Sequence, residues 1–218
     1  MAVLHDLDTL EQHYSSFDYY HTTGYTAPGY MDFPINQVKV HEILCQLSNK
    51  KFDHVPSVLD VGCAYGFIVQ HLREAGVNAW GVDISDYALS QAPDETKPFV
   101  KKGWAHSLPF ADRQFDMVVS FGMMEHMPDG FLDQTIQELE RVSKPHEDGH
   151  SGLISVTLST DFDAEGDESH SALKNYDEWK EILPQGFDLW SDMEEVWKWY
   201  AAEGYNPSAN FTWEHKVY

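Results

Sequence analysis

The sequence has few basic residues, and this shortage argues against a nucleic acid partner. Lysine and arginine number 14 against 36 aspartates and glutamates, which gives a formal charge of −22 at pH 7. Affinity for nucleic acids depends on clustered Lys and Arg that displace counterions from phosphates. We therefore expect no nucleic acid partner. An acidic surface is explained more simply by solubility or a salty habitat than by a cationic partner.

Cysteines and long apolar runs are also scarce. No apolar run approaches the ~20 residues that a bilayer-spanning helix requires, so we expect no membrane partner. The first residues lack the basic and apolar regions of a secretory signal. The two cysteines, Cys45 and Cys63, fall in a predicted helix and a predicted turn, and they do not form a disulfide framework. These features predict a cytoplasmic protein.

The stretch 57–72 organises the rest of the chain. Residues 58–61 read as a short buried strand, with Asp60 near its carboxyl end. Small residues at 62–66 form a turn, and apolar residues at helical spacing follow in 67–72. Strand, glycine turn and helix make the first unit of a nucleotide-binding α/β sheet. The alternative is a tight turn that any α/β protein can contain.

The glycine spacing narrows the choice of ligand. A dinucleotide fold expects G-x-G-x-x-G, whereas this turn has Gly62-x-x-x-Gly66 preceded by Asp60. The pattern resembles motif I of the class I S-adenosylmethionine-dependent methyltransferases, in the variant Asp-x-Gly-Cys-x-x-Gly. The resemblance implies that S-adenosylmethionine is the cofactor and S-adenosylhomocysteine its product. It assigns Asp60, Gly62, Cys63, Ala64 and Gly66 to cofactor binding.

A second strand is predicted over residues 79–84, and Asp83 stands near its end. An acid about 20 residues past the first glycine can bridge ribose hydroxyls, so we assign Asp83 and the adjacent Ile84 to the cofactor. The alternative is that Asp83 caps the helix that begins at Asp86.

The run from Lys101 to Phe121 is the most specific part of the resemblance. It is similar to the methyltransferase run Gly-Asp-Ala-Glu-x-Leu-Pro-Phe-x-Asp-x-x-Phe-Asp-x-Val. However, Trp104 replaces the acid that commonly accepts the adenine amino proton. Adenine recognition is then expected from the backbone near Ala105, from His106, or from stacking on Trp104. Ser120 is also assigned to the cofactor.

The segment after this strand lies beside the transferable methyl group in the resembling enzymes. Glu125 and His126 match a Glu-His pair found there, so we predict both as catalytic, with His126 as a base for an oxygen acceptor. A structural histidine is the alternative. Gly122 stands where a metal-binding relative carries Glu, so no metal is expected. The family often has a histidine in a later loop, and His170 is predicted on the acceptor side, with a solvated surface histidine as the alternative.

Residues 1–34 are rich in aromatic side chains and are broken by Gly24, Pro28 and Gly29. They are predicted to form a loop-rich arm, which the resemblance places over the cofactor as a lid. Tyr19 and Tyr25 are assigned to the cofactor, because tyrosine faces suit a sulfonium cation. The alternative is that these rings only fix the arm to the core.

The fold predicted for residues 35–218 is one α/β domain, a Rossmann-like, seven-stranded, mostly parallel sheet flanked by helices. The resemblance implies the strand order 3-2-1-4-5-7-6. The later elements include a helix ending near residue 142, a fifth strand and a final antiparallel strand. A sixth strand is predicted at 186–190 and a helix at 192–203.

The predicted function is methyl transfer from S-adenosylmethionine to an oxygen or nitrogen of a small-molecule acceptor. One alternative is a homologue that binds S-adenosylmethionine or S-adenosylhomocysteine without turnover. The other is a protein or RNA methyltransferase, which should show a basic groove or a further recognition domain; neither is visible. The identity of the acceptor stays open, as does the choice between monomer and homodimer.

Overall fold

The structure is a computed structural model. It describes residues 7–22, 30–32, 34–49, 52–145, 153–158, 174, 176–183 and 209–214.

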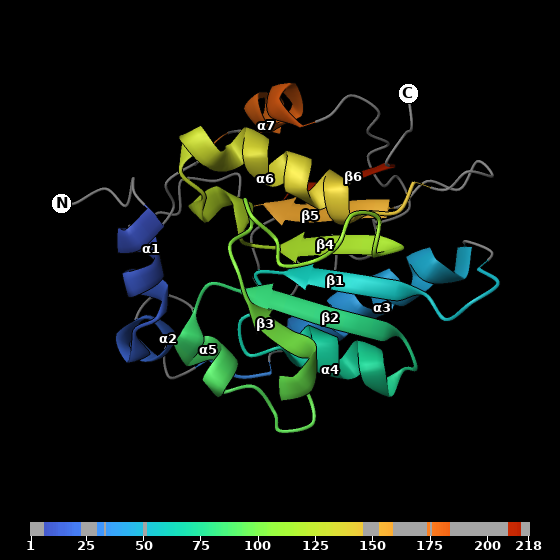
Figure 1. Ribbon diagram of the computed structural model, residues 1–218, viewed down its shortest axis with the longest axis horizontal. Helices are drawn as coiled ribbons and strands as arrows, with labels where there is room; N and C mark the ends of the chain where they lie inside the picture. The colour runs from blue at the N-terminus through green and yellow to red at the C-terminus, as the bar shows by residue number, and fades with distance from the viewer. Residues whose placement is uncertain are drawn as a thin grey trace.

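Within these residues the chain forms a six-stranded sheet in the order β3-β2-β1-β4-β5-β6. The strands are β1 (Ser57–Val61), β2 (Asn78–Asp83), β3 (Val100–Lys102), β4 (Met117–Phe121), β5 (Leu153–Leu158) and β6 (Ala209–Glu214). The first five strands are parallel and β6 pairs antiparallel with β5. In register, Asp60 of β1 lies opposite Gly81 of β2 and Val119 of β4. Parallel strands point their carboxyl ends to one edge, where α1 and α2 lie (Figure 1).

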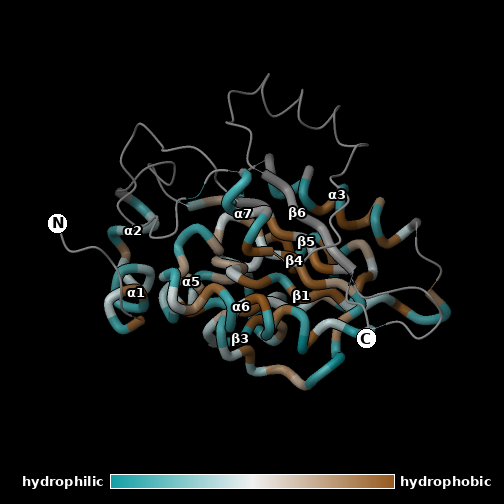
Figure 2. The backbone as a smooth tube through the Cα atoms, turned by 90° about the horizontal axis from the view of Figure 1, so that it is seen from above, coloured by the Kyte–Doolittle hydropathy of each residue, from teal (hydrophilic) through white to brown (hydrophobic). Residues whose placement is uncertain are grey.

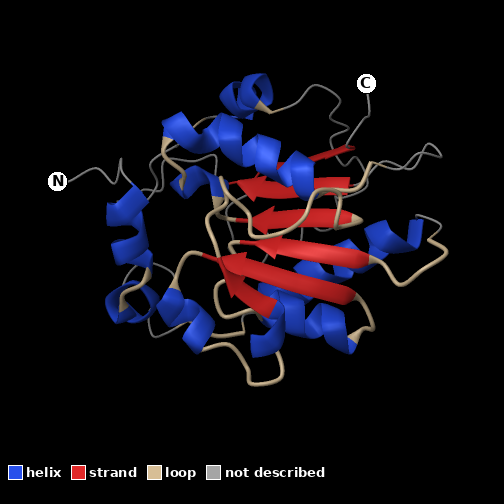
Figure 3. Cartoon of the chain, viewed as in Figure 1, coloured by secondary structure: helices blue, strands red, loops and turns tan. Residues whose placement is uncertain are grey.

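Helices flank both faces of this sheet (Figure 3). The α-helices are α1 (Leu7–Tyr14), α2 (Phe17–Thr22), α3 (Pro34–Asn49), α4 (Phe67–Glu74), α5 (Asp86–Ser90), α6 (Asp129–Val142) and α7 (Tyr176–Ile182). Two 3-10 helices, η2 (Lys97–Phe99) and η3 (Met124–His126), lie between them in the chain. No helix among the described residues is long and apolar enough to cross a membrane.

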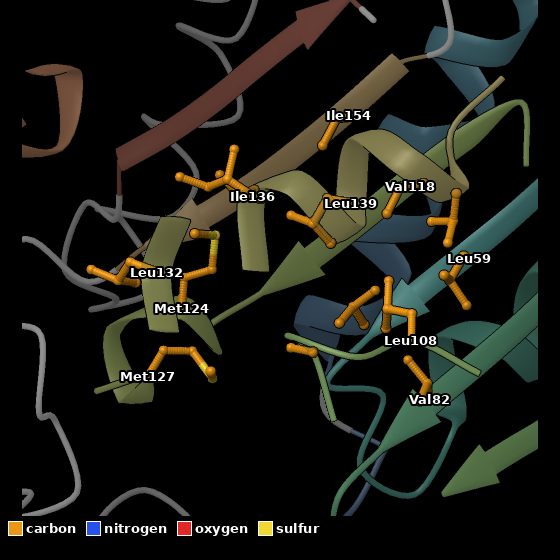
Figure 4. Packing of buried hydrophobic residues seen from close by; sticks show 14 of the residues in the cluster. Leu59, Val82, Leu108, Val118, Met124, Met127, Leu132, Ile136, Leu139 and Ile154 are labelled. Atoms are coloured by element: carbon orange, nitrogen blue, oxygen red, sulfur yellow. The ribbon is translucent and has the colours of Figure 1, made fainter. Parts of the chain in front are cut away.

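The alternation of side chains along β1 divides the core into two layers. Val58 joins apolar side chains of α3 and α4 on one face of the sheet. Leu59 joins α6 and α7 on the other face, where Leu139 and Ile154 are also fully buried (Figure 4). Both faces are covered, so the central strands are mostly hydrophobic, as Figure 2 shows for β1, β4 and β5. The packing on both faces fixes the positions of the strand ends that form the site.

The structure confirms an α/β fold with a mostly parallel sheet. The order of the first five strands and the antiparallel direction of the last one agree with the expected topology. The predicted strand 186–190 and helix 192–203 lie outside the described residues, so the count of seven strands stays a prediction.

The expectation of a loop-rich N-terminal arm is wrong for residues 7–22, which form α1 and α2. The glycines and prolines that suggested loops come only after Thr22. Ahead of them, Leu10 and Tyr14 stand four residues apart and are buried on one face of α1. The Ser85 hydroxyl donates a hydrogen bond to the Tyr14 carbonyl at 2.6 Å. This bond fixes α1 to the start of α5. The division of the chain at residue 34 stays a prediction.

Candidate functional site

A cavity opens at the carboxyl ends of β1, β2 and β4. Its volume is about 120 Å³. Strand ends, the turn after β1, the loop after β3, η3 and the two N-terminal helices all contribute to its wall. In a sheet of this topology, ligands bind at this edge.

The turn after β1 is built from residues with left-handed backbone. Gly62, Ala64 and Gly66 have φ of +83°, +46° and +75°, a region that favours glycine. The N–H groups of Gly62 and Cys63 both donate to the Val82 carbonyl, at 2.8 and 3.1 Å. These bonds hold the turn against the end of β2, and Gly62 and Ala64 line the cavity. Gly66 lines neither of the two cavities described here.

Gly66 is needed for packing as well as for its backbone shape. A Cβ there would lie 3.1 Å from the Thr96 methyl and 3.2 Å from Val100. Gly66 therefore approaches Val100 of β3 closely, which gives it a structural role, and its predicted contact with the cofactor stays a prediction.

Asp83 joins the turn to the end of β2. One carboxylate oxygen accepts the Ala64 N–H at 2.8 Å, and the other accepts the Ser85 N–H at 2.8 Å. Burial raises the pKa of Asp83 above its ordinary value, although these N–H donors act in the opposite direction. Asp83 also lines the cavity. The same carboxylate can thus shape the turn and face a ligand.

The loop after β3 supplies the wall predicted to contact adenine. Trp104 and Ala105 line the cavity together with Gly103 and Ile84. A Cβ on Gly103 would come within 2.6 Å of the Pro109 ring, so only glycine fits at that point of the loop.

Two side chains predicted to contact the cofactor do not line either cavity. The His106 ring lies between Trp104 and Phe131, at 5.5 and 4.8 Å between ring centroids, and burial lowers its pKa. Ser120 is buried inside β4, at 1% exposure. His106 thus packs beside the cavity wall and Ser120 lies in the core, and their contacts with the cofactor stay predictions.

Glu125 and His126 point in different directions although they are adjacent. Gly122 leaves β4 with φ +63°, and η3 then turns through a bond from the His126 N–H to the Met123 carbonyl at 3.0 Å. His126 lines the cavity, and its ring meets the Tyr14 ring edge-on at 5.5 Å. Glu125 is 3% exposed and does not line the cavity. The structure therefore separates the pair, and only His126 faces the site.

Most of the aromatic wall was not foreseen from the sequence. Tyr19, which was predicted to contact the cofactor, lines the cavity, and Tyr14, Tyr20 and Tyr30 line it as well. Tyr14 and Tyr19 meet edge-on at 4.7 Å, and Tyr19 and Tyr20 at 4.9 Å. The i, i+4 spacing of Leu10 and Tyr14 was the available signal for a helix that turns a tyrosine inward.

Two predicted residues, Tyr25 and His170, lie outside the described part of the chain. Across the part that is described, no group of three or more His, Cys, Asp and Glu side chains is arranged to hold a metal ion.

A second, smaller cavity of about 30 Å³ is lined in part by the glycine turn. Asp60 and Cys63, both predicted to contact the cofactor, line this cavity and not the larger one. Lys39 of α3 also lines it, and it was not foreseen from the sequence. Burial raises the pKa of Asp60 to about 7, while the charge of Lys39 opposes that rise. Gly62, Tyr30 and Phe121 line both cavities, so the two are neighbours.

Comparison with known proteins shows which proteins this chain resembles in sequence. A family model described as a methyltransferase domain matches residues 58–146. The malonyl-[acyl-carrier protein] O-methyltransferase of Erwinia billingiae is 37% identical over 105 residues, 48% of this chain and 39% of that protein. The mitochondrial arginine-hydroxylase NDUFAF5 of Rattus norvegicus is 30% identical over 109 residues, 48% of this chain and 31% of that protein. The chain thus spans less than half the length of these two curated relatives.

A solved structure shares the fold. The [4+2]-cyclase SpnF matches with a TM-score of 0.53 and 23% identity, over 71% of this chain and 59% of that chain. At this identity the likeness concerns the fold alone.

Proposed function

We propose that the chain is a class I S-adenosylmethionine-dependent methyltransferase, which the methyltransferase-domain match over residues 58–146 supports, and that it transfers a methyl group to an oxygen or nitrogen of a small molecule. One observation carries this proposal: a single cavity at the carboxyl ends of the strands joins the glycine turn, Asp83, an aromatic wall and His126. The family name alone would not distinguish an enzyme from a homologue that only binds.

The residues of the cavity fit the cofactor. The Asp83 carboxylate can accept hydrogen bonds from ribose hydroxyls, and the Trp104 indole offers a flat face to a purine. The tyrosine wall presents ring faces that attract a sulfonium cation. S-adenosylmethionine, when bound, supplies an activated methyl group. The protein then has to align the acceptor and exclude water, which is worth several kcal/mol when the geometry is right.

His126 is the residue we propose for proton transfer. It lines the cavity from η3, next to the end of β4. An imidazole titrates near neutral pH and can take a proton from a hydroxyl acceptor. Glu125 has no place in this step because its buried side chain is outside the cavity.

Two observations support a small acceptor over a macromolecule. Leu10 and Tyr14 of α1, with Tyr19 and Tyr20 of α2, form part of the cavity wall and so narrow the entrance. The formal charge of −22 also opposes binding to a phosphate backbone. Proteins of similar sequence carry different activities, since one relative is named a methyltransferase and another an arginine hydroxylase.

The proposal is tested in two steps. Calorimetry with S-adenosylhomocysteine should show binding to the wild-type protein. S-adenosylmethionine with a radiolabelled methyl group is then incubated with a small-molecule extract, and label should pass to a low-molecular-weight product. Binding without transfer to any fraction would favour the homologue that does not turn over. Label in protein or RNA would favour the macromolecular alternative.

We also propose that turnover needs no divalent metal, because Gly122 occupies the position where metal-binding relatives carry Glu. Labelled-methyl transfer should continue unchanged in EDTA. Loss of transfer in chelator with recovery in magnesium would contradict this part of the proposal.

A further inference from the structure

Helix α1 brings an aromatic ring to His126 from outside residues 58–146, which the family model matches. Tyr14 is the last residue of α1, and it lines the large cavity together with His126 of η3. The two ring planes stand at 80° to each other with their centroids 5.5 Å apart. This edge-to-face arrangement is one that aromatic rings favour. The N-terminal helix therefore contacts the side chain proposed for proton transfer.

The His126 imidazole needs such a contact if it is to act as a base. The backbone of η3 is held by the bond from the His126 N–H to the Met123 carbonyl at 3.0 Å. The torsion that turns a histidine ring is broad and roughly two-fold, so the backbone alone leaves the direction of the ring nitrogens open. A general base must point one nitrogen at the acceptor hydroxyl within hydrogen-bond reach. The orientation of the ring is therefore part of the mechanism.

Tyr14 can orient that ring because it is itself held in place. Its carbonyl accepts the Ser85 hydroxyl at 2.6 Å, and its ring meets the Tyr19 ring edge-on at 4.7 Å. One turn earlier in α1, Glu11 binds the Lys102 ammonium at the end of β3, at 2.6 Å. Tyr14 is 9% exposed. A buried ring fixed from two elements offers a firm surface to its neighbour.

The same contacts connect the base to the acid assigned to the ribose. The Ser85 N–H donates to Asp83 at 2.8 Å, and the Ser85 hydroxyl donates to the Tyr14 carbonyl. A continuous series of contacts thus runs from Asp83 through Ser85 and Tyr14 to His126. It joins the donor side of the cavity to the side of the proposed base.

We propose that Tyr14 is a positioning residue for the reaction. Its ring holds the His126 imidazole in the orientation that receives the acceptor proton, and Ser85 fixes the place of that ring. This inference rests on the proposed function and on the role proposed there for His126. The competing explanation is that Tyr14 only fills the cavity wall.

A double-mutant cycle distinguishes the two explanations. Transfer of labelled methyl from S-adenosylmethionine to the extract fraction that accepts it gives kcat, and calorimetry gives the affinity for S-adenosylhomocysteine. Tyr14→Leu should lower kcat by roughly 3–10-fold, the usual size of an aromatic pair contact expressed as a rate, and leave that affinity within about twofold. Tyr14→Phe keeps the ring and should keep kcat. In a His126→Ala background, Tyr14→Leu should cause no further loss, because no imidazole is left to orient.

Tyr87→Leu is the matched control for removal of a tyrosine ring. Tyr87 of α5 packs against Tyr20 with ring centroids 5.7 Å apart and lines neither cavity. Its kcat should stay within about twofold of wild type. Urea unfolding of every variant corrects the rates for the folded fraction. Tyr14→Met provides the same comparison if Tyr14→Leu does not fold, because methionine adapts to irregular gaps.

The outcomes separate this inference from the function on which it rests. An equal loss of kcat on Tyr14→Leu in both backgrounds would mean that Tyr14 acts on the wall or the fold, and the inference is overturned. A loss in Tyr14→Phe as large as in Tyr14→Leu would overturn it as well, because the ring would not be the active part. If wild-type protein transfers label to no fraction, the proposed function itself fails. If transfer occurs and Tyr14→Leu is as fast as wild type, the proposed function survives and only the inference is lost.

Discussion

One carboxylate oxygen of Asp83 accepts the backbone N–H of Ala64 at 2.8 Å, across nineteen residues of sequence. Ala64 has a left-handed backbone with φ +46°, which costs free energy for a residue with a Cβ. The bond from the end of β2 helps to hold this conformation. The acid predicted for the ribose is therefore also part of the scaffold of the glycine turn.

Asp83→Ala should lower both cofactor affinity and stability. Two backbone N–H groups, those of Ala64 and Ser85, would lose their acceptor, at a cost of about 1–3 kcal/mol in the free energy of unfolding. Loss of the ribose contact should weaken S-adenosylhomocysteine binding by ~10-fold or more. Calorimetry and urea unfolding measure the two effects.

Asp86→Ala is the control for this variant. Asp86 is an exposed acid at the start of α5, paired with Lys102 on the surface, and such pairs contribute little. It should leave affinity unchanged. The ribose assignment is wrong if Asp83→Ala binds S-adenosylhomocysteine as tightly as wild type.

His126→Ala should lower kcat by ~10²–10⁴-fold, the usual contribution of a general base, and leave cofactor affinity nearly unchanged. Steady-state kinetics with the acceptor found by the label screen, together with calorimetry, give both values. His106→Ala is the matched control, because that histidine packs beside Trp104 outside the cavity. It should change stability and not kcat.

The predicted role of His170 can be tested in the same assay, where His170→Ala should raise KM if the residue reaches the acceptor. Full activity in His126→Ala with a lowered melting temperature would mean that His126 only packs against Tyr14. Alignment of the acceptor would then be the whole mechanism.

Gly81→Ala should destabilise the protein by about 1–3 kcal/mol through overpacking. A Cβ at this point of β2 would lie 2.7 Å from the Cys63 sulfur and 3.0 Å from a Val69 methyl. Gly130→Ala is the control in α6, where an added Cβ meets nothing within 4 Å. It should be neutral or stabilise by up to ~1 kcal/mol. Urea unfolding compares them, and equal stabilities would contradict the packing argument.

A second prediction concerns the pH dependence of stability. It involves a cluster of charged side chains around Asp116, near the amino ends of β1 and β4. Asp116 is buried, and its carboxylate binds the Ser57 N–H at 2.8 Å, Lys144 at 3.1 Å and His54 at 3.1 Å. Hydrogen bonds to Asp53 and then to Asp116 raise the pKa of His54 above its ordinary value. The stability that this shift contributes is fully present below the unfolded pKa of ~6.5 and is lost as the pH rises through the folded pKa.

His54→Gln should therefore cost more stability at about pH 5.5 than at about pH 9. Urea unfolding across this range measures the difference between the two proteins. The pKa of Asp116 is lowered, so its carboxylate stays charged throughout. In an Asp116→Asn background the pH dependence should shrink. A constant cost across the range would show that the histidine contributes only through packing.

The sequence alone predicted the first strands of the sheet and the edge of the sheet at which a site would form. Apolar residues at 58–61, a small-residue turn and Asp83 predicted a strand, a turn and an acid at one edge, because backbone conformation at glycine and burial of alternating side chains are local properties. The structure agrees that Gly62, Ala64 and Asp83 line one cavity. The resemblance in 101–121 similarly located Trp104 and Ala105 on its wall.

Only the tertiary structure decided which neighbouring side chains face that cavity. Glu125 and His126 are adjacent in the sequence, yet the turn of η3 buries one and presents the other. Lys39 and Asp60 are far apart in the sequence, yet they line one small cavity because α3 packs beside the glycine turn. Such placements depend on how helices pack against the sheet. Local residue patterns cannot encode them, because the distances that decide them join residues separated by long stretches of chain.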